Sequence, residues 1–456
     1  MKKVYILGAS LACLFAACKP SVNITVPPTA GDATFTNYMA IGNSLTAGYA
    51  DNSLYVSGQL NSYPQRLFEQ FSLIAVHGAV GDFYQPLLHS DMGYPGPRKE
   101  LAMVYSCAGD SGLAPIDLAS FSADAQDAAT YHSAGPNGQI NNIGVPGIRV
   151  ADYSLVSYGA LNPYAKRFYN NPNTGTPQSE LAFRVSNLHP TFFTMWLGAN
   201  DVLGYATAGG QGDGSGNALP PAPNYYNTND ITPTTVFDTN FKAAVATAIS
   251  TGAKGALINI PDITTIPFFT TIPINGLTLT RQGQVDTLTA YYGSINYQFQ
   301  LGANQFVVRD HNGNVRQSVP GELILLTIPT DSIKCAGWGS YVPIPQKYVI
   351  TTEELQNIKN ATTRFNEIIK GEAFRRNLAY VDMFSYMGTL QSGITFNGIN
   401  YNANFVTGGA FSLDGVHLTP RGYALVANKI IDAINYQYHA TISPVNVNKF
   451  DGVKFP

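Results

Sequence analysis

Four short segments, separated by long stretches of chain, place the strongest constraint on how these 456 residues can fold. They read G-N-S-L at 42–45, N-I-G-V-P-G at 142–147, G-A-N-D at 198–201 and D-G-V-H at 414–417. Together they contain a serine hydroxyl, a glycine amide, a side-chain amide, and a carboxylate three residues before an imidazole. These are the parts of a serine acyl-transfer site. If the parts meet in space, everything between the first and the last segment belongs to one catalytic unit or is inserted in it.

The chemistry explains why these residue types occur together. A serine hydroxyl is a poor nucleophile at neutral pH, so it needs a base and a group that holds this base in the right tautomer. Asp414 and His417 are three residues apart, and a tight loop at that spacing can bring the carboxylate to the imidazole Nδ1–H. The Nε2 atom is then free to face Ser44 Oγ. Attack on an ester carbonyl creates an oxyanion, which requires preorganised hydrogen-bond donors.

In their order, the segments resemble the blocks of the SGNH (GDSL-type) hydrolases, a family named for its catalytic serine, glycine, asparagine and histidine. The resemblance implies that Ser44 is the nucleophile, with His417 as base and Asp414 as its partner. It also implies an oxyanion hole made by the Ser44 N–H, the Gly147 N–H and the Asn200 side-chain amide. The chain departs from the family at position 43, where the usual aspartate is Asn43. That position is not one of the four that name the family, so the catalytic assignment stands.

Each segment also has a purely structural interpretation. Ser44 could cap a helix, Gly147 could form a turn, Asn200 could end a strand, and Asp414 could cap the helix that follows it. These alternatives are independent of one another, whereas a catalytic site predicts all four segments in a fixed order. We therefore predict the site.

Other catalytic signatures fit less well. G-D-S-G at 109–112 is similar to the nucleophile segment of chymotrypsin-like proteases, but no upstream histidine segment matches that fold, so Ser111 is predicted to lie in a loop. No G-x-S-x-G elbow occurs. The remaining histidines lack the spacing of metal ligands, so we expect neither a catalytic metal nor another cofactor.

Alternating apolar patterns indicate the fold class. A strand at 35–41 would deliver Ser44 at its carboxyl end, where ligands gather in open α/β sheets. The alternation predicts a three-layer α/β/α sandwich with a mostly parallel, flavodoxin-like sheet, the architecture expected of an SGNH hydrolase. The further strands are expected at 192–197, 256–260 and 378–383, and the helices at 236–251, 355–374 and 422–436.

The predicted hydrolase domain covers 35–440, with insertions near 82–141, 205–235 and 262–350 and a C-terminal tail at 441–456 that has no readable role. Within the third insertion, 305–328 is expected to form a hairpin around Asn312-Gly313, either as a lid or as a surface ornament.

Two further features leave alternatives open. The aromatic run at 266–273 either lines the substrate pocket or packs in the core. Cys107 and Cys335 form a disulfide or remain two buried thiols.

The N-terminus resembles a bacterial lipoprotein signal. Lys2-Lys3 precede an apolar run that ends in F-A-A-C, too short to span a bilayer, although Phe15 is unusual in that box. We expect 1–17 to be removed, Cys18 to carry the lipid, and 18–34 to be a flexible tether. The protein would then be exported and anchored in the cell envelope, on the periplasmic or outer-membrane face. A plain secretory signal is the alternative.

Charge excludes one class of partner. Without Lys2 and Lys3, 24 basic residues face 29 acidic ones, a net charge of −5, and no basic cluster occurs, so nucleic acid binding lacks its electrostatic basis. The abundance of neutral polar and aromatic residues suits carbohydrate. We expect a serine esterase that acts on acylated glycans or lipids. An acyl transferase, or a non-catalytic glycan-binding or assembly lipoprotein on the same scaffold, is the alternative.

Overall fold

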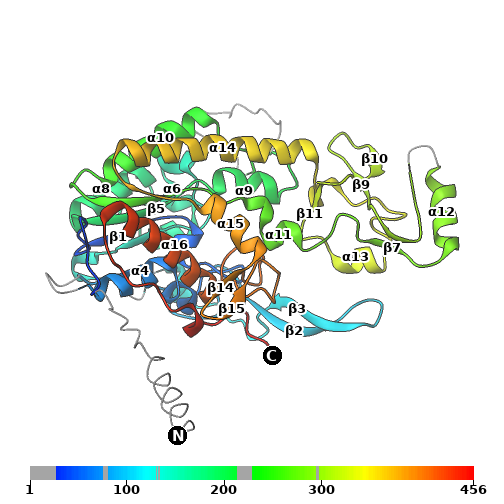
Figure 1. Cartoon of the computed structure of the whole chain (residues 1–456), viewed down its shortest axis with the longest axis horizontal. Coiled ribbons are helices and arrows are strands. Elements are labelled where there is room, and N and C mark those ends of the chain that lie inside the picture. Colours follow the sequence, from blue (N-terminus) through cyan, green and yellow to red (C-terminus); the bar gives the residue numbers. More distant parts are fainter. Residues whose placement is uncertain (1–26, 75–80, 130, 132–133, 213–228, 294–296) are drawn as a thin grey trace, which may run out of the picture.

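The computed structural model describes residues 27–74, 81–129, 131, 134–212, 229–293 and 297–456. Its centre is a five-stranded parallel sheet in the order β13-β6-β5-β1-β4 (Figure 1). Every residue of β1 and β5 is buried, as expected of parallel strands that are covered on both faces. The five strands are β1 (Tyr38–Gly42), β4 (Asn142–Gly144), β5 (Phe192–Trp196), β6 (Lys254–Ile258) and β13 (Ala379–Val381).

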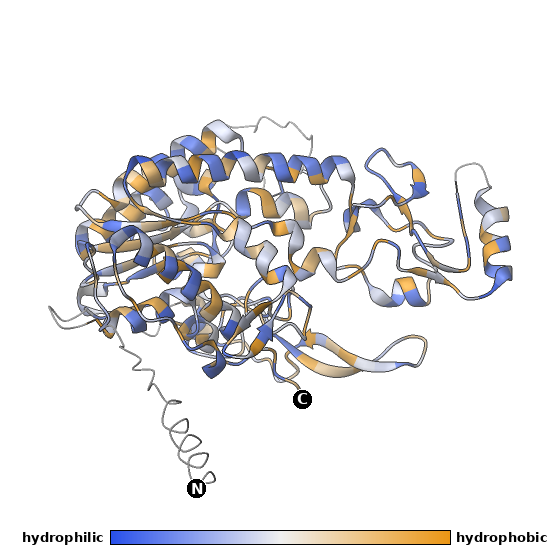
Figure 2. Cartoon of the chain, in the orientation of Figure 1, coloured by the Kyte–Doolittle hydropathy of each residue, from blue (hydrophilic) through white to orange (hydrophobic). Residues whose placement is uncertain are grey.

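Helices cover both faces of this sheet. In Figure 1, α4 and α16 lie on one face, and α8, α10 and α14 lie on the other. Their apolar sides face the strands and their polar sides face outward, which Figure 2 shows along α14. The result is the predicted three-layer α/β/α sandwich. The helices are α4 (Tyr63–Ser72), α8 (Pro177–Leu188), α10 (Thr234–Ala248), α14 (Thr352–Arg375) and α16 (Pro420–Tyr438).

Local sequence sets where these elements begin. Thr351 caps α14 in a capping box with Glu354, and Thr419 caps α16 with Pro420 at its first turn. The predicted strand at 35–41 begins later, at Tyr38, and the predicted helix at 422–436 is longer by two residues at each end.

The first insertion contains an element that the sequence analysis missed. Strands β2 (Lys99–Tyr105) and β3 (Ser111–Asp117) form an antiparallel hairpin that projects from the body. The prediction of a loop at Ser111 is therefore wrong, because this residue pairs with Tyr105 at the start of β3. The insertion also holds α5 (Ala125–Ala129).

The second insertion, 205–235, lies between two helices. Its first three residues still belong to α9 (Asn200–Thr207), and its last two begin α10. Residues 213–228, which include the second half of its Gly-rich stretch at 208–217, lie outside the described residues.

The third insertion, 262–350, which we call the inserted module, extends away from the sheet (Figure 1). Of the hairpin predicted at 305–328, the part around the Asn312-Gly313 turn is confirmed, with Arg309 opposite Val315. Its last strand is shorter than expected and pairs elsewhere, with Leu323 opposite Ile350. Phe268 and Phe269 are buried in the main core, so the aromatic run packs in the core. The α-helices and strands of the module are α11 (Pro267–Thr270), α12 (Gln282–Tyr292), α13 (Thr330–Lys334), β7 (Leu277–Leu279), β8 (Gly302–Asn304), β9 (Val307–Arg309), β10 (Val315–Gln317), β11 (Leu323–Ile324) and β12 (Val349–Ile350).

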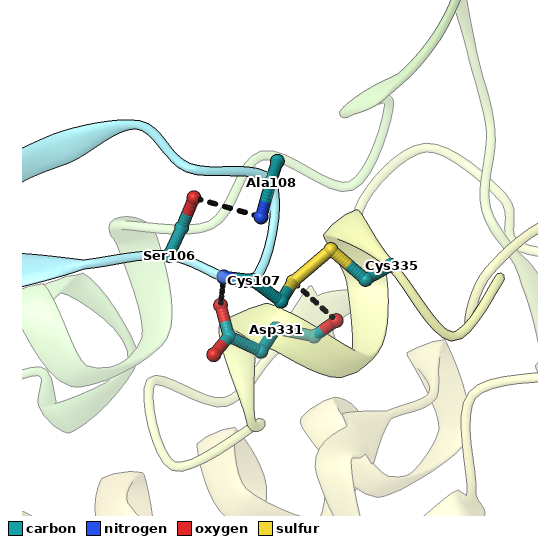
Figure 3. Close-up of a disulfide and its surroundings, with 5 residues drawn as sticks. All are labelled: Ser106, Cys107, Ala108, Asp331 and Cys335. Atoms are coloured by element: carbon teal, nitrogen blue, oxygen red, sulfur yellow. Dashed lines mark hydrogen bonds between the residues drawn. A yellow bond between two sulfur atoms is a disulfide. The ribbon is translucent and has the colours of Figure 1, made fainter.

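A disulfide joins the first and third insertions. Cys107 at the tip of the β2–β3 hairpin is bonded to Cys335 just after α13 (Figure 3). The Cys107 N–H also donates to Asp331 Oδ1 at 3.4 Å. Of the two alternatives left open for these cysteines, the structure has the disulfide.

The C-terminal tail packs against the main core. In the tail, the side chains of Ile442, Val445 and Val447 are buried against the main core. Residues 1–26, which hold the predicted signal, Cys18 and most of the tether, lie outside the described residues. Within the described part of the chain, no helix combines the length and the apolar character needed to cross a bilayer.

Candidate active site

The sheet brings three of the four segments to one edge. Strands β1, β4 and β5 end level, because Gly42 lies opposite both Gly144 and Trp196. Ser44 follows the end of β1 by two residues, Gly147 follows β4 by three, and Asn200 follows β5 by four. Since β1 lies between β4 and β5 in the sheet, the loops with Gly147 and Asn200 flank Ser44.

Ser44 is held at the start of a short helix, α2 (Ser44–Ala47). The Asn43 side chain caps this helix by accepting from the Leu45 N–H at 3.1 Å, so the asparagine in place of the usual aspartate keeps the cap. A Cβ atom at Gly42 would lie 2.0 Å from Thr46 Oγ1. Only glycine therefore lets the helix turn back so closely onto the strand.

The two distant segments meet through a chain of hydrogen bonds. His417 Nε2 lies 2.9 Å from Ser44 Oγ, and His417 Nδ1 lies 2.8 Å from Asp414 Oδ2. The serine and the histidine are 373 residues apart in sequence. This arrangement can move a proton from the hydroxyl to the imidazole while the carboxylate faces the other ring nitrogen.

The Asp414 carboxylate is saturated with donors. Its Oδ1 accepts from the N–H groups of Val416 and His417, both at 2.8 Å, and from Ser412 Oγ at 3.1 Å. Its Oδ2 accepts from the Asn52 N–H at 2.9 Å. Burial acts to raise the pKa of Asp414, but the His417 charge and these hydrogen bonds outweigh it and hold the pKa well below its ordinary value. The carboxylate therefore stays ionised.

The loop after the nucleophile supports this acid, and the sequence analysis did not identify it. Asp51 and Asn52 both adopt positive φ angles, 52° and 64°, which Asn and Asp tolerate better than most residues. Besides the Asn52 bond, Asp51 N–H donates to Ser412 Oγ at 3.0 Å, and Asp51 Oδ1 accepts from the Leu413 N–H at 3.0 Å. In the sequence, the adjacent Asp51 and Asn52 could have indicated this loop, because Asp and Asn favour turns.

Backbone donors lie next to Ser44. Gly147 has a φ of 82°, and the atom nearest to a Cβ built there is Asn162 Nδ2 at 3.9 Å, so the space beside it is open. Within the described residues, neither the Ser44 N–H nor the Gly147 N–H has a hydrogen-bond partner. Both are therefore free to donate to an oxygen of a bound molecule.

Asn200 adds a side-chain donor at the same edge. Its Nδ2 donates to the Ile148 carbonyl at 2.9 Å, and the amide has a second N–H. The next residue, Asp201, is fully buried and accepts from the N–H groups of Val150 and Ala151 at 2.8 and 3.1 Å. Burial raises the pKa of Asp201 to about 6. These bonds fix the loop after Gly147 against the start of α9.

Within the ranges that the structure describes, no group of three or more His, Cys, Asp or Glu side chains is placed to hold a metal ion.

Comparison with known proteins identifies the family. The family model described as GDSL-like Lipase/Acylhydrolase matches residues 38–430. Among solved structures, the chain is similar to a family 3 carbohydrate esterase of Clostridium thermocellum, with 12% identity, a TM-score of 0.32, and 88% of this chain and 96% of that chain covered. No curated protein matches the sequence. Because the family match spans most of the chain, including all four segments, the protein belongs to the GDSL-like lipase/acylhydrolase family and is an ester hydrolase.

Proposed function

We propose that the protein is a serine esterase in which Ser44, His417 and Asp414 form the catalytic triad and an acyl-enzyme is the intermediate. The observation that carries the proposal is the continuous hydrogen-bonded path from Ser44 Oγ through His417 to Asp414, with distances of 2.9 and 2.8 Å. The ionised state of Asp414 supports it, since an anion at that position stabilises the imidazolium that forms during the reaction.

The steps follow from this geometry. As Ser44 Oγ attacks the ester carbonyl carbon, its proton passes to His417 Nε2. The tetrahedral intermediate collapses when the bond to the alcohol oxygen breaks, and His417 returns the proton to that oxygen. A water molecule then gives a proton to His417 and attacks the acyl carbon. When this second tetrahedral intermediate collapses, the bond to Ser44 Oγ breaks, His417 returns the proton to Oγ, and the carboxylic acid leaves.

The oxyanion of each tetrahedral intermediate would be held by three donors. These are the unpartnered N–H groups of Ser44 and Gly147 and the second N–H of the Asn200 amide. A single donor of this kind accounts for roughly 3 to 4 kcal/mol of transition-state stabilisation in other enzymes.

We also propose that the protein acts in the bacterial cell envelope. Export and lipid anchoring there are supported by the basic residues Lys2 and Lys3, by the short apolar run that follows them, and by Cys18. Acylated glycans and lipids are both ester substrates available there.

The test measures hydrolysis of p-nitrophenyl esters from acetate to palmitate by the mature protein and by Ser44→Ala. We expect turnover of short acyl chains and a loss of at least about a thousandfold in the variant. Ser111→Ala is the matched control, because Ser111 is exposed at the start of β3, and it should retain full activity. Equal rates in Ser44→Ala and the unmodified protein would contradict the proposal.

A further inference from the structure

We propose that three tyrosines beside His417, namely Tyr49, Tyr164 and Tyr94, bind the sugar ring of an acylated carbohydrate as the alcohol part of the ester. The inference rests on the proposed esterase function and narrows its substrate class. We call these residues the tyrosine row.

The row begins at the catalytic histidine. The Tyr49 ring lies 4.5 Å from the His417 imidazole, measured between centroids. Tyr164 follows at 6.2 Å from Tyr49, and Tyr94 follows at 5.7 Å from Tyr164. Successive rings stand nearly perpendicular, at 78° and 88°, an arrangement favoured by aromatic quadrupoles. The three rings therefore form one continuous row of aromatic contacts that starts at His417.

Hydrogen bonds tie the row to the catalytic loops. The Tyr49 N–H donates to the Ser44 carbonyl at 3.0 Å, and its hydroxyl donates to the Asn52 carbonyl at 2.6 Å. Asn162 caps the helix turn that carries Tyr164 and donates to the Pro146 carbonyl at 3.0 Å, next to Gly147. The rings are thus positioned by the same loops that hold the nucleophile and the proposed oxyanion donors.

The packing beneath the row determines what a ligand would touch. Ala47, Leu54 and Leu88 form a small apolar cluster and are at most 4% exposed. The three tyrosines pack on this cluster and are themselves half-buried. A ligand in contact with the row therefore meets the exposed parts of the three rings and of Val56, which is partly buried in the same cluster, while Ala47, Leu54 and Leu88 stay covered.

Such a surface suits a sugar better than a fatty acyl chain. A sugar ring presents C–H groups on its faces and hydroxyls on its rim, which match the apolar body and polar tip of tyrosine. A long acyl chain is instead bound by a continuous apolar groove. Burial also raises the pKa of Tyr164 to about 12, so its phenol stays protonated at neutral pH.

The proposed mechanism specifies which part of the substrate meets the row. His417 returns its proton to the oxygen of the departing alcohol, so the alcohol must leave beside His417. Of the three rings in the row, that of Tyr49 contacts this imidazole. The alcohol part of the ester therefore lies on the row, and the sugar is the leaving group.

The experiment compares two acetate esters that differ only in the alcohol. We would measure kcat/KM for a mono-O-acetylated methyl glucoside and for ethyl acetate. The unmodified protein should prefer the glucoside, and Tyr164→Ala should reduce this preference about tenfold, the order of magnitude expected for a lost aromatic contact. Tyr164→Phe keeps the ring and should retain most of the preference. Tyr436→Ala is the matched control, since Tyr436 is 87% exposed near the far end of α16, and it should change nothing.

Tyr94→Ala provides a second test if Tyr164→Ala does not fold, and it should lower the same preference. An unchanged preference in a folded Tyr164→Ala or Tyr94→Ala protein would overturn the inference. So would an unmodified protein that hydrolyses ethyl acetate or ethyl octanoate, both unactivated alkyl esters, faster than the glucoside ester. Both outcomes leave the esterase function intact. Failure to hydrolyse any ester, together with no fluorophosphonate labelling of Ser44, would instead overturn the proposed function and this inference with it.

Discussion

The sheet that carries the site and the inserted module at 262–350 are stabilised in different ways. The sheet strands lie in one large hydrophobic core, with β1 and β5 buried along their whole length. The strands of the module have two or three residues each, and its own apolar clusters are small. Three of the four candidate site segments follow the ends of strands in the large core, which fixes their positions. The module depends more on local turns and on the Cys107–Cys335 disulfide.

The largest expected effect is a loss of activity on substitution of Asp414, compared with Asp310, an aspartate of the module that also accepts backbone hydrogen bonds. Asp414 accepts from three backbone N–H groups and faces the His417 ring, whereas Asp310 in the module accepts from the N–H groups of Asn312 and Asn314 at 3.0 and 2.9 Å. Asp414→Asn should lower kcat by about a thousandfold to ten-thousandfold, because the imidazole loses its orienting anion. The measurement is steady-state hydrolysis of p-nitrophenyl acetate.

Asp310→Asn is the control for this prediction. The asparagine keeps a side-chain oxygen for the turn and does not contact the site, so activity should change by less than about twofold, as for most surface changes. A comparable loss in both variants would show that activity does not depend on the anion beside His417.

The next effect compares the two cores. Phe365 is fully buried in the main core and stacks on Phe237 at 4.1 Å between centroids. Phe365→Ala should lower the free energy of unfolding of the whole protein by about 3 to 5 kcal/mol. Phe306→Ala, in the core of the module, should instead increase amide hydrogen exchange within the module and leave the sheet protected. Denaturant unfolding with hydrogen exchange separates the two results. A loss of sheet protection in Phe306→Ala would show that the two regions unfold together.

A smaller and more local effect is expected from the disulfide. Cys107→Ser/Cys335→Ser removes the link between the β2–β3 hairpin and α13 (Figure 3). Local stability should fall by about 2 to 4 kcal/mol, because the hairpin and the module become free to separate. Hydrogen exchange should rise in α13 and at the hairpin tip, and p-nitrophenyl acetate hydrolysis should persist. If hydrolysis is lost instead, the module supports the site directly.

Candidate site residues were easier to identify in the sequence than the elements of the insertions, for a physical reason. Because a catalytic residue must be of one chemical type, the sequence alone points to Ser44, Gly147, Asn200 and His417 as candidates. The alternation of buried strands and amphipathic helices predicted the sandwich in the same way.

The residues that escaped prediction act through their backbone or through distant packing. Asn52 holds Asp414 with a main-chain N–H across 362 residues, a role that any residue with the same conformation could fill. Tyr49 becomes significant only when the fold places its ring on His417. All but one of the residues in strands β2 and β3 are exposed or only partly buried, so these strands lack the buried pattern that identifies a strand. Cys107 and Cys335 are 228 residues apart in sequence, and this separation does not indicate whether their sulfur atoms lie within bonding distance.

The most direct test of the central claim is covalent labelling of the nucleophile. The mature protein would be incubated with a fluorophosphonate, and the adduct would be located by intact mass and peptide mapping. We predict one adduct per chain, on Ser44, that is absent in Ser44→Ala and forms much more slowly in His417→Ala. An unlabelled protein, or an adduct on another serine such as Ser111, would contradict the account.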